Sequence, residues 1–238
     1  MGCPLYLAMT AAEFSAAVPL PPKPAWMACH FSPYGTGLSN LPQRMPEDGM
    51  LILNDWYPVQ NHSPEQIRDE LYALVSKFHI QRLLLDMQRP HQPHPQRIVD
   101  CIVCDPPCDV GVSPLYDTGH CAVFLPPPPP DMPIDTYLEC CQGRKIWLEV
   151  TTESTCLEVT QQGCREVAEE LPQTTTEHWD PALFCHYRIH LQKDRISFSL
   201  YRKKDDILQL LNSPQAERVE CAVALCQDFS KRKTALQM

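Results

Sequence analysis

The sequence predicts an α/β fold, a small parallel barrel in which strands alternate with helices. Short apolar runs recur at fairly even spacing along the 238 residues, and most are followed by a polar loop or a helix-like stretch. This order is typical of β/α units around a parallel sheet. There are eight such runs, and their apolar residues are nearly continuous, as strands buried on both faces require. Eight strands favour closure into a (β/α)8, TIM-barrel-like domain.

Each predicted strand is an apolar run bounded by polar or proline-containing segments. In chain order the eight strands are expected at Pro4–Met9, Ala25–Phe31, Met50–Asp55, Arg82–Met87, Asp109–Ser113, Cys121–Leu125, Lys145–Val150 and Val219–Cys226.

The clearest predicted helix covers Pro64–Phe78. Ser63 is a typical N-cap residue, and a proline suits the first helical position because its missing N–H would have no partner there. Apolar residues recur through this segment at helical spacing. Short connections around 105–116 predict an irregular part of the barrel. Further helices are expected at Ala11–Ala17, Gln96–Val103, Ile134–Cys140 and Asp205–Leu211.

One region departs from the β/α order and predicts an antiparallel β insertion between the seventh and eighth strands. Residues alternate between apolar and polar in Cys156–Thr160, His186–Leu191 and Arg195–Tyr201, and polar turn residues separate these segments. The whole chain, 1–238, is therefore expected to form one domain, with 154–203 as the insertion. Because loops after the strands line the active-site face, the insertion should project from that face.

Composition narrows the classes of partner. Acidic residues outnumber basic ones by 29 to 20, which gives a net charge of −9. Nucleic-acid binding needs clustered Lys and Arg that displace counterions, so no nucleic-acid partner is expected. No apolar run reaches the roughly 18 to 20 residues that cross a bilayer, so no membrane partner is predicted either.

The amino terminus and the cysteines favour a cytoplasmic protein. The segment MGCPLYLAMTAAEF has no basic flank before its short apolar stretch, unlike a secretory signal. The 13 cysteines are odd in number, which argues against a complete disulfide framework and favours reduced thiols. The 25 prolines, roughly twice the average share, lie mainly between the apolar runs, where they stiffen loops.

Polar and aromatic side chains gather where the predicted strands end. In a parallel barrel, the residues that do chemistry sit at or just after the carboxyl ends of the strands. This mixture suits a sugar, whose hydroxyls bond to carboxylates and amides while its apolar ring face stacks on Trp or Tyr. The predicted substrate-binding residues are Tyr34, Asn54, Asp55, Trp56, Gln88 and Tyr116.

Asp86 and Glu149 are the predicted catalytic pair. Each interrupts an apolar strand near its end, in LLLDMQ and IWLEV. Glycoside cleavage requires two carboxylates facing each other, one as acid and one as nucleophile or base. The structural alternative is that either carboxylate caps a helix or pairs with Arg89 or Arg144, because a charge near a buried strand end needs a partner in any case.

The order of strand MLILND, helix and strand QRLLLDMQ, between Met50 and Pro90, resembles the family 18 glycoside hydrolases, the chitinase group. In that family the fourth strand ends in spaced aspartates and a catalytic glutamate. The predicted β insertion also resembles one that some members carry. The similarity covers about forty residues.

On this resemblance Asp86 takes the last aspartate position, Gln81 and Leu84 take the earlier two, and Gln88 takes the position of the acid glutamate. An amide does not donate a proton to a leaving oxygen as a carboxylic acid does. The resemblance therefore implies the fold and sugar binding but not the family's chemistry. Hydrolysis would need Glu149 or Asp55 in a different role.

Several cysteines have metal-ligand character without a complete pattern. Cys101, Cys104 and Cys108 are spaced C-x2-C-x3-C, with His120 and Cys121 further on. Thiolates bind zinc and iron–sulfur centres, but the first two cysteines also share one face of a predicted helix.

Three loop segments have features of a binding site, but a purely structural role explains each of them as well. His91 and His94 lie in a proline-stiffened loop without a third ligand, and the glycines of HFSPYGTGLSNLP lack both a G-x-G-x-x-G pattern and a Walker lysine. The run Pro126–Pro130 suits a rigid connection. No metal and no cofactor is predicted.

The sequence thus predicts a carbohydrate-active or carbohydrate-binding barrel with an altered catalytic site, and it leaves open whether the protein is an enzyme. The alternative is a non-catalytic lectin or protein-interaction scaffold on a decayed glycosidase-like barrel, favoured by Gln88 and the proline-rich loops. A metal enzyme that uses the cysteines or the loop histidines is a third hypothesis. An oligosaccharide is the expected ligand, and fold alone does not decide function in so widely used an architecture.

Overall fold

The structure is a computed structural model, and the part of the chain that it describes comprises most strands and helices. These residues are 3–10, 25–31, 49–54, 63–86, 95–116, 118–128, 132–150, 155–160, 163–167, 177–181, 185–192, 195–201 and 204–224.

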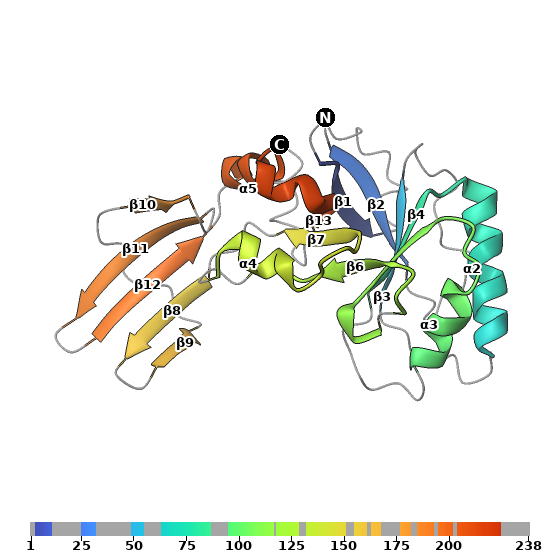
Figure 1. Cartoon of the computed structure of the whole chain (residues 1–238), viewed down its shortest axis with the longest axis horizontal. Coiled ribbons are helices and arrows are strands. Elements are labelled where there is room, and N and C mark those ends of the chain that lie inside the picture. Colours follow the sequence, from blue (N-terminus) through green and yellow to red (C-terminus); the bar gives the residue numbers. More distant parts are fainter. Residues whose placement is uncertain are drawn as a thin grey trace.

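Eight parallel strands of the described chain close into a barrel with the order β1-β13-β7-β6-β5-β4-β3-β2 (Figure 1). All eight predicted strands are present, and each ends within about two residues of its predicted limits. They are β1 (Leu5–Thr10), β2 (Ala25–Phe31), β3 (Met50–Asn54), β4 (Arg82–Asp86), β5 (Asp109–Val112), β6 (Ala122–Leu125), β7 (Ile146–Val150) and β13 (Val219–Ala224).

Helices occupy several of the connections between these strands, so the prediction of an α/β barrel is confirmed. A regular (β/α)8 repeat is not present, because only a three-residue 3-10 helix, η2 (Pro114–Tyr116), joins β5 to β6 in the predicted irregular region. The predicted helix Ala11–Ala17 lies outside the described residues. The other predicted helices are observed as α2 (Pro64–Phe78), α3 (Pro95–Val103), α4 (Ile134–Glu139) and α5 (Lys204–Leu211), and a second 3-10 helix, η3 (Pro214–Arg218), precedes β13.

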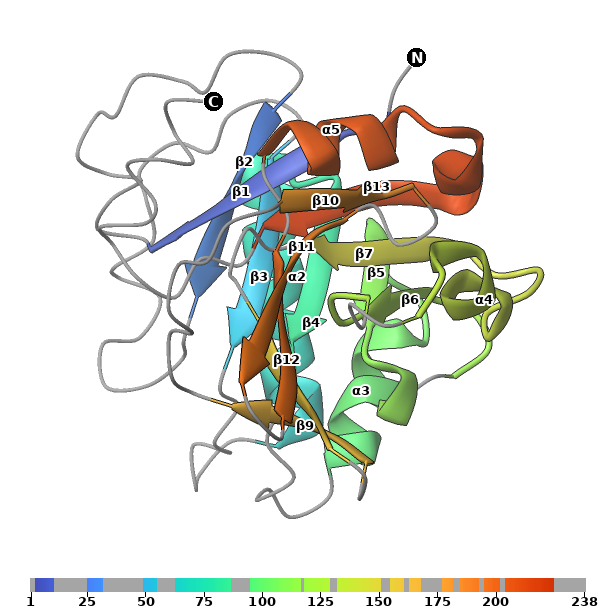
Figure 2. The same ribbon diagram turned by 90° about the vertical axis from the view of Figure 1, so that its left-hand side faces the viewer.

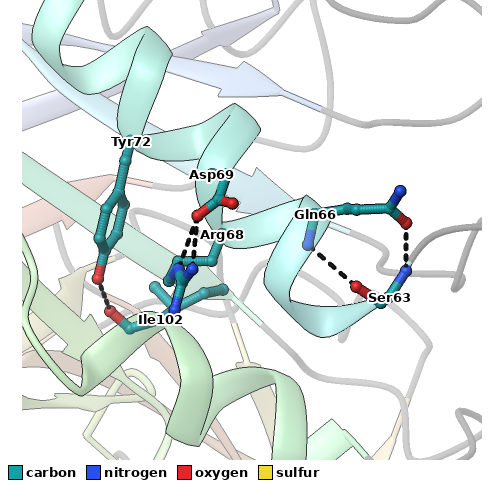
Figure 3. Close-up of polar contacts among 6 residues, drawn as sticks. All are labelled: Ser63, Gln66, Arg68, Asp69, Tyr72 and Ile102. Atoms are coloured by element: carbon teal, nitrogen blue, oxygen red, sulfur yellow. Dashed lines mark hydrogen bonds and ion pairs between the residues drawn. The ribbon is translucent and has the colours of Figure 1, made fainter.

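Helix α2 begins and ends with local signals that the sequence carries. The Ser63 hydroxyl accepts from the Gln66 backbone N–H at 3.2 Å, and the Gln66 side chain accepts from the Ser63 N–H at 2.8 Å, which forms a capping box (Figure 3). His79 ends the helix in the left-handed conformation, with φ of 53°. The Tyr72 hydroxyl of α2 donates to the Ile102 carbonyl of α3, which joins the two helices on the outside of the barrel.

The outward faces of the strands pack against the helices in two clusters. Leu83 and Leu85 of β4 pack with residues of α2 and α3, and Leu148 and Val150 of β7 pack with residues of α4 and α5. These residues alternate with those that face the interior, as the two-residue period of a strand requires. Among the described helices, none is long and apolar enough to cross a membrane.

A third cluster fills the barrel interior, and all of its residues come from strands. Trp147 of β7 is its largest member and has no exposed surface. Gly111 of β5 leaves space for the indole ring, since a Cβ on this glycine would lie 2.2 Å from Trp147 Cε3. The interior is therefore packed with side chains and is not an open channel.

The predicted antiparallel insertion is present between β7 and β13. It is a five-stranded sheet with the order β10-β11-β12-β8-β9, and it extends away from the barrel after the carboxyl end of β7 (Figures 1 and 2). Its strands are β8 (Thr155–Thr160), β9 (Gly163–Val167), β10 (Glu177–Asp180), β11 (Cys185–Gln192) and β12 (Arg195–Tyr201).

Among the described residues, Trp179 and His186 contact the barrel's helical layer from this sheet. Trp179 of β10 packs against the core cluster that contains α4 and α5. His186 Nδ1 of β11 lies 2.8 Å from Asp206 Oδ2 of α5, and the Asp206 side chain is only 6% exposed. A carboxylate buried to this degree needs such a partner, so the contact holds the insertion to the barrel helices.

The fit between Gly111 and Trp147 is a test of the packed interior. We expect Gly111→Ala to lower the free energy of unfolding by about 3 kcal/mol, because the added methyl overlaps a fully buried ring. Urea denaturation followed by circular dichroism measures the loss. Gly119→Ala is the control: its Cβ meets nothing within 4 Å, and its φ of +84° costs only about 1 kcal/mol. Equal losses in the two variants would contradict the overlap.

Candidate functional site

Asp86 lies at the carboxyl end of β4, where the barrel fold places functional side chains. It is half-buried, and strand alternation puts it on the same face as Leu84, which belongs to the interior cluster. Asn54, the last residue of β3, is its partner in the parallel register. The backbone thus brings these two predicted site residues to neighbouring positions on one rim.

Glu149 is the second predicted catalytic carboxylate and is the penultimate residue of β7. It is half-buried, and because it lies two residues after Trp147 on the same strand, it is on the same, interior face. The Tyr137 hydroxyl of α4 donates to the Pro126 carbonyl just after β6, at 2.8 Å. Burial raises the pKa of Tyr137, and the negative charges of Cys140, Cys141 and Glu149 raise it further. Glu149 therefore lies close enough to Tyr137 for their electrostatic interaction to matter.

The two carboxylates therefore share a rim and a face, with β5 and β6 between their strands. Carboxylates on the interior face of a barrel rim bind the hydroxyls of a ligand that enters the barrel mouth. At the separations that glycosidases use, such a pair also performs acid and base or nucleophilic catalysis. The catalytic pairing of Asp86 with Glu149 stays a prediction.

Of the remaining predicted site residues, the structure describes only Tyr116. Tyr116 in η2 is 8% exposed and packs in the cluster between the barrel and helices α2 and α3. Tyr116 is therefore a core residue in this structure. Contact between Tyr116 and a substrate stays a prediction. Tyr34, Asp55, Trp56 and Gln88 lie outside the described residues, as do His91 and His94.

The comparisons with known proteins concern the fold. No protein-family model matches this chain, and no curated protein does. The spore cortex-lytic enzyme SleL of Bacillus cereus is similar in structure, with a TM-score of 0.52 and 8% identity over 99% of this chain and 74% of that one.

SleL of Bacillus megaterium QM B1551 has a TM-score of 0.49 at 8% identity over 99% of this chain and 73% of that one. The putative sporulation-specific glycosylase YdhD of Bacillus subtilis has a TM-score of 0.44 at 10% identity over 74% and 79%. At identities this low, the likeness to the first SleL establishes a shared fold alone.

A cavity of about 660 Å³ lies at the opposite end of the barrel. Its wall includes Asp109 at the start of β5, Ala122 at the start of β6, Lys145 just before β7 and Glu220 near the start of β13, so it sits against the amino ends of four neighbouring strands. Sequence reasoning missed this cavity because its wall comes from segments up to 120 residues apart, from Asp100 to Glu220.

The cavity brings together most of the cysteine and histidine residues that the sequence indicated as metal ligands. Cys104, Cys108, His120 and Cys121 all line it, whereas Cys101 does not. Yet no group of three or more His, Cys, Asp or Glu side chains within the described ranges is arranged to hold a metal ion. The three cysteines form no disulfide, and these four residues share a cavity without forming a coordination site.

Charged groups are paired along one side of the cavity. Lys145 Nζ lies 3.2 Å from Glu220 Oε1 and 3.6 Å from Asp109 Oδ1. The hydrogen bond to Glu220 and the charges of both carboxylates raise the pKa of Lys145. Trp147 Nε1 donates to Glu220 Oε2 at 3.0 Å, which connects the cavity wall to the barrel interior.

A β-bulge explains how Glu220 reaches both partners. The register between β13 and β7 shifts between Val219 and Cys221, so that two steps along β13 oppose one step along β7. Glu220 is the extra residue, and a bulge re-aims the side chain that it carries. Its carboxylate is 27% exposed and lies between the indole of Trp147 and the ammonium of Lys145.

The thiols of this cavity should differ in reactivity. Burial, followed by the charge of Asp109, raises the pKa of Cys108 to about 12, whereas Cys104 on the same loop is exposed. At pH 8 only about one Cys108 in ten thousand is then a thiolate, the form that reacts with iodoacetamide.

We expect Cys104 to be alkylated at least about tenfold faster than Cys108 in the folded protein, as measured by peptide mass spectrometry over time. The Cys108 rate should rise about tenfold per pH unit between pH 7 and 9, since its thiolate fraction does. Unfolding in urea is the control and should equalise the two rates. Equal rates in the folded state would contradict the buried, neutral thiol.

Proposed function

We propose that this protein binds carbohydrate at the carboxyl-end rim of the barrel, in the manner of a carbohydrate-active protein with an altered catalytic site. The observation that carries the proposal is the position of Asp86 and Glu149, two half-buried carboxylates at the ends of β4 and β7 on the interior face. Asn54 is in backbone register with Asp86 at the same rim.

The polarity of this rim supports a sugar over an apolar ligand. In each strand, the three residues before the carboxylate are almost fully buried. The two carboxylates therefore lie at the edge of the packed interior. Carboxylate oxygens accept hydrogen bonds from hydroxyl groups, so both side chains are suited to bind a sugar. The barrel fold that this chain shares with the cortex-lytic enzyme SleL is compatible with a site at this rim.

Turnover is the finer part of the proposal. Hydrolysis would assign Glu149 and Asp86 to the acid and the nucleophile or base. A lectin would use the same carboxylates to bind hydroxyls without cleavage, and this second candidate is favoured by Gln88, the amide at the position where the resembling family has its acid. Both candidates require sugar binding, whereas a protein-interaction scaffold does not.

A thermal-shift screen against oligosaccharides, including N-acetylglucosamine oligomers and peptidoglycan fragments, tests the proposal. A ligand at about ten times its dissociation constant adds about 1.4 kcal/mol, which raises Tm by about 3 to 6 °C for a domain of this size. We expect Asp86→Asn and Glu149→Gln to reduce this shift and to abolish any release of reducing sugar.

Asp135→Asn is the matched control, because this exposed aspartate lies in the first turn of α4. It should leave both binding and turnover unchanged. Sugar binding that persists in both rim variants would contradict the site. A flat response across near-saturating sugars would overturn the proposed function and favour a protein partner.

A further inference from the structure

The cavity at the amino ends of β5, β6, β7 and β13 is separate from the carboxyl-end rim. Asp86 and Glu149 lie at the opposite ends of their strands, and neither lines the cavity. Its volume of about 660 Å³ is within the range of about 300 to 1,000 Å³ typical of small-molecule sites. The space is therefore large enough for an organic ligand and is not explained by the proposed carbohydrate site.

The charge of the cavity wall selects the sign of a ligand. Four carboxylates line it, from Asp100, Asp105, Asp109 and Glu220, against the single ammonium of Lys145. The four carboxylates and the ammonium give the lining a formal charge of −3, and the Arg144 guanidinium, which donates to the Cys121 carbonyl of the wall, reduces the acidic excess to −2. An anionic ligand would be repelled, and a cationic ligand would be attracted.

Lys145 is an example, within the cavity itself, of how the wall holds an alkylammonium group. Its Nζ lies between Glu220 and Asp109 at 3.2 and 3.6 Å, and its pKa is raised by these neighbours. The Glu220 carboxylate is held in turn by the indole N–H of the fully buried Trp147. The position of the Glu220 carboxylate, one of the two that contact the Lys145 ammonium, is thus fixed by a residue of the barrel interior.

The rest of the wall suits a ligand with methylene groups. Val103 ends α3, Val110 follows Asp109 in β5, and Ala122 begins β6, and all three are apolar. Pro106 and Cys108 add apolar surface from the loop between α3 and β5. Burial of Cys108 raises its pKa to about 12, so this thiol is neutral at physiological pH. Apolar patches and carboxylates therefore share one cavity.

We propose that this cavity binds a linear polyamine, a small molecule whose ammonium groups are joined by short methylene chains. The ammonium groups pair with Asp105, Asp109 and their acidic neighbours, and the methylene chain lies on the apolar part of the wall. A metal ion fits less well, because the described residues contain no arrangement of three or more ligands for one. The inference does not rest on the proposed carbohydrate function.

Isothermal titration calorimetry of the full chain with spermidine, at low ionic strength, tests this inference, because screening weakens exposed charge pairs above about 0.1 M salt. We expect saturable binding to the protein. Butane-1,4-diol, which has hydroxyls in place of ammonium groups, should give none, and potassium chloride at matched ionic strength should not reproduce the heat.

Asp105→Asn removes one exposed carboxylate of the wall and should raise the dissociation constant for spermidine at least about fivefold. Asp105→Asn combined with Asp109→Asn should raise it at least about twentyfold, because each ammonium contact is lost separately. Asp135→Asn, on the exposed face of α4 and away from the wall, is the charge-matched control and should have no effect.

The rim variants separate this site from the carbohydrate site. Asp86→Asn and Glu149→Gln should leave spermidine binding unchanged, and Asp105→Asn should leave any sugar-dependent thermal shift unchanged. Absence of saturable spermidine binding to the wild-type protein would overturn the inference. So would binding that Asp105→Asn and Asp135→Asn weaken equally, since this would indicate a general response to net charge.

Discussion

The packing of Trp147 in the barrel interior is the contact on which the rest of the structure depends. Its ring is fully buried, occupies the space beside Gly111 of β5, and donates its N–H to Glu220 of β13. One side chain of β7 thus contacts strands on both sides of it in the barrel order. A small parallel barrel closes only when its interior is filled, and a single large ring does much of that filling here.

The same residue couples the interior to the amino-end cavity. Glu220 accepts the indole N–H and pairs with Lys145, and its position as the bulged residue of β13 makes both contacts possible. Arg82, the register partner of Asp109, donates through its Nη1 to the Tyr6 hydroxyl at 2.6 Å. The amino end therefore carries paired charges of both signs, whereas the carboxyl end of the described strands carries the carboxylates Asp86 and Glu149. This difference is the basis of the separate ligands that we propose for the two ends of the barrel.

The chain's periodicity was sufficient to predict the strands and most helices. Runs such as RLLLD and IWLEV are apolar on both faces, and only strands covered by helices outside and side chains inside require that pattern. Helix α2 was predicted with its observed bounds because Ser63, Pro64 and the spaced apolar residues all act locally. The candidate rim followed from the same reasoning, since a residue at a strand end stays at the rim in any parallel barrel.

The sequence by itself therefore determined the order of strands and helices, the insertion after β7 and the rim positions of Asp86 and Glu149, because each depends on residues close together in the chain. Tertiary structure alone decided that Tyr116 packs in the core, that Gly111 accommodates Trp147, and that Cys104, Cys108 and His120 share an acidic cavity with Lys145 and Glu220. These features arise where barrel closure and a bulge bring distant segments together, and no local period in the sequence encodes such contacts.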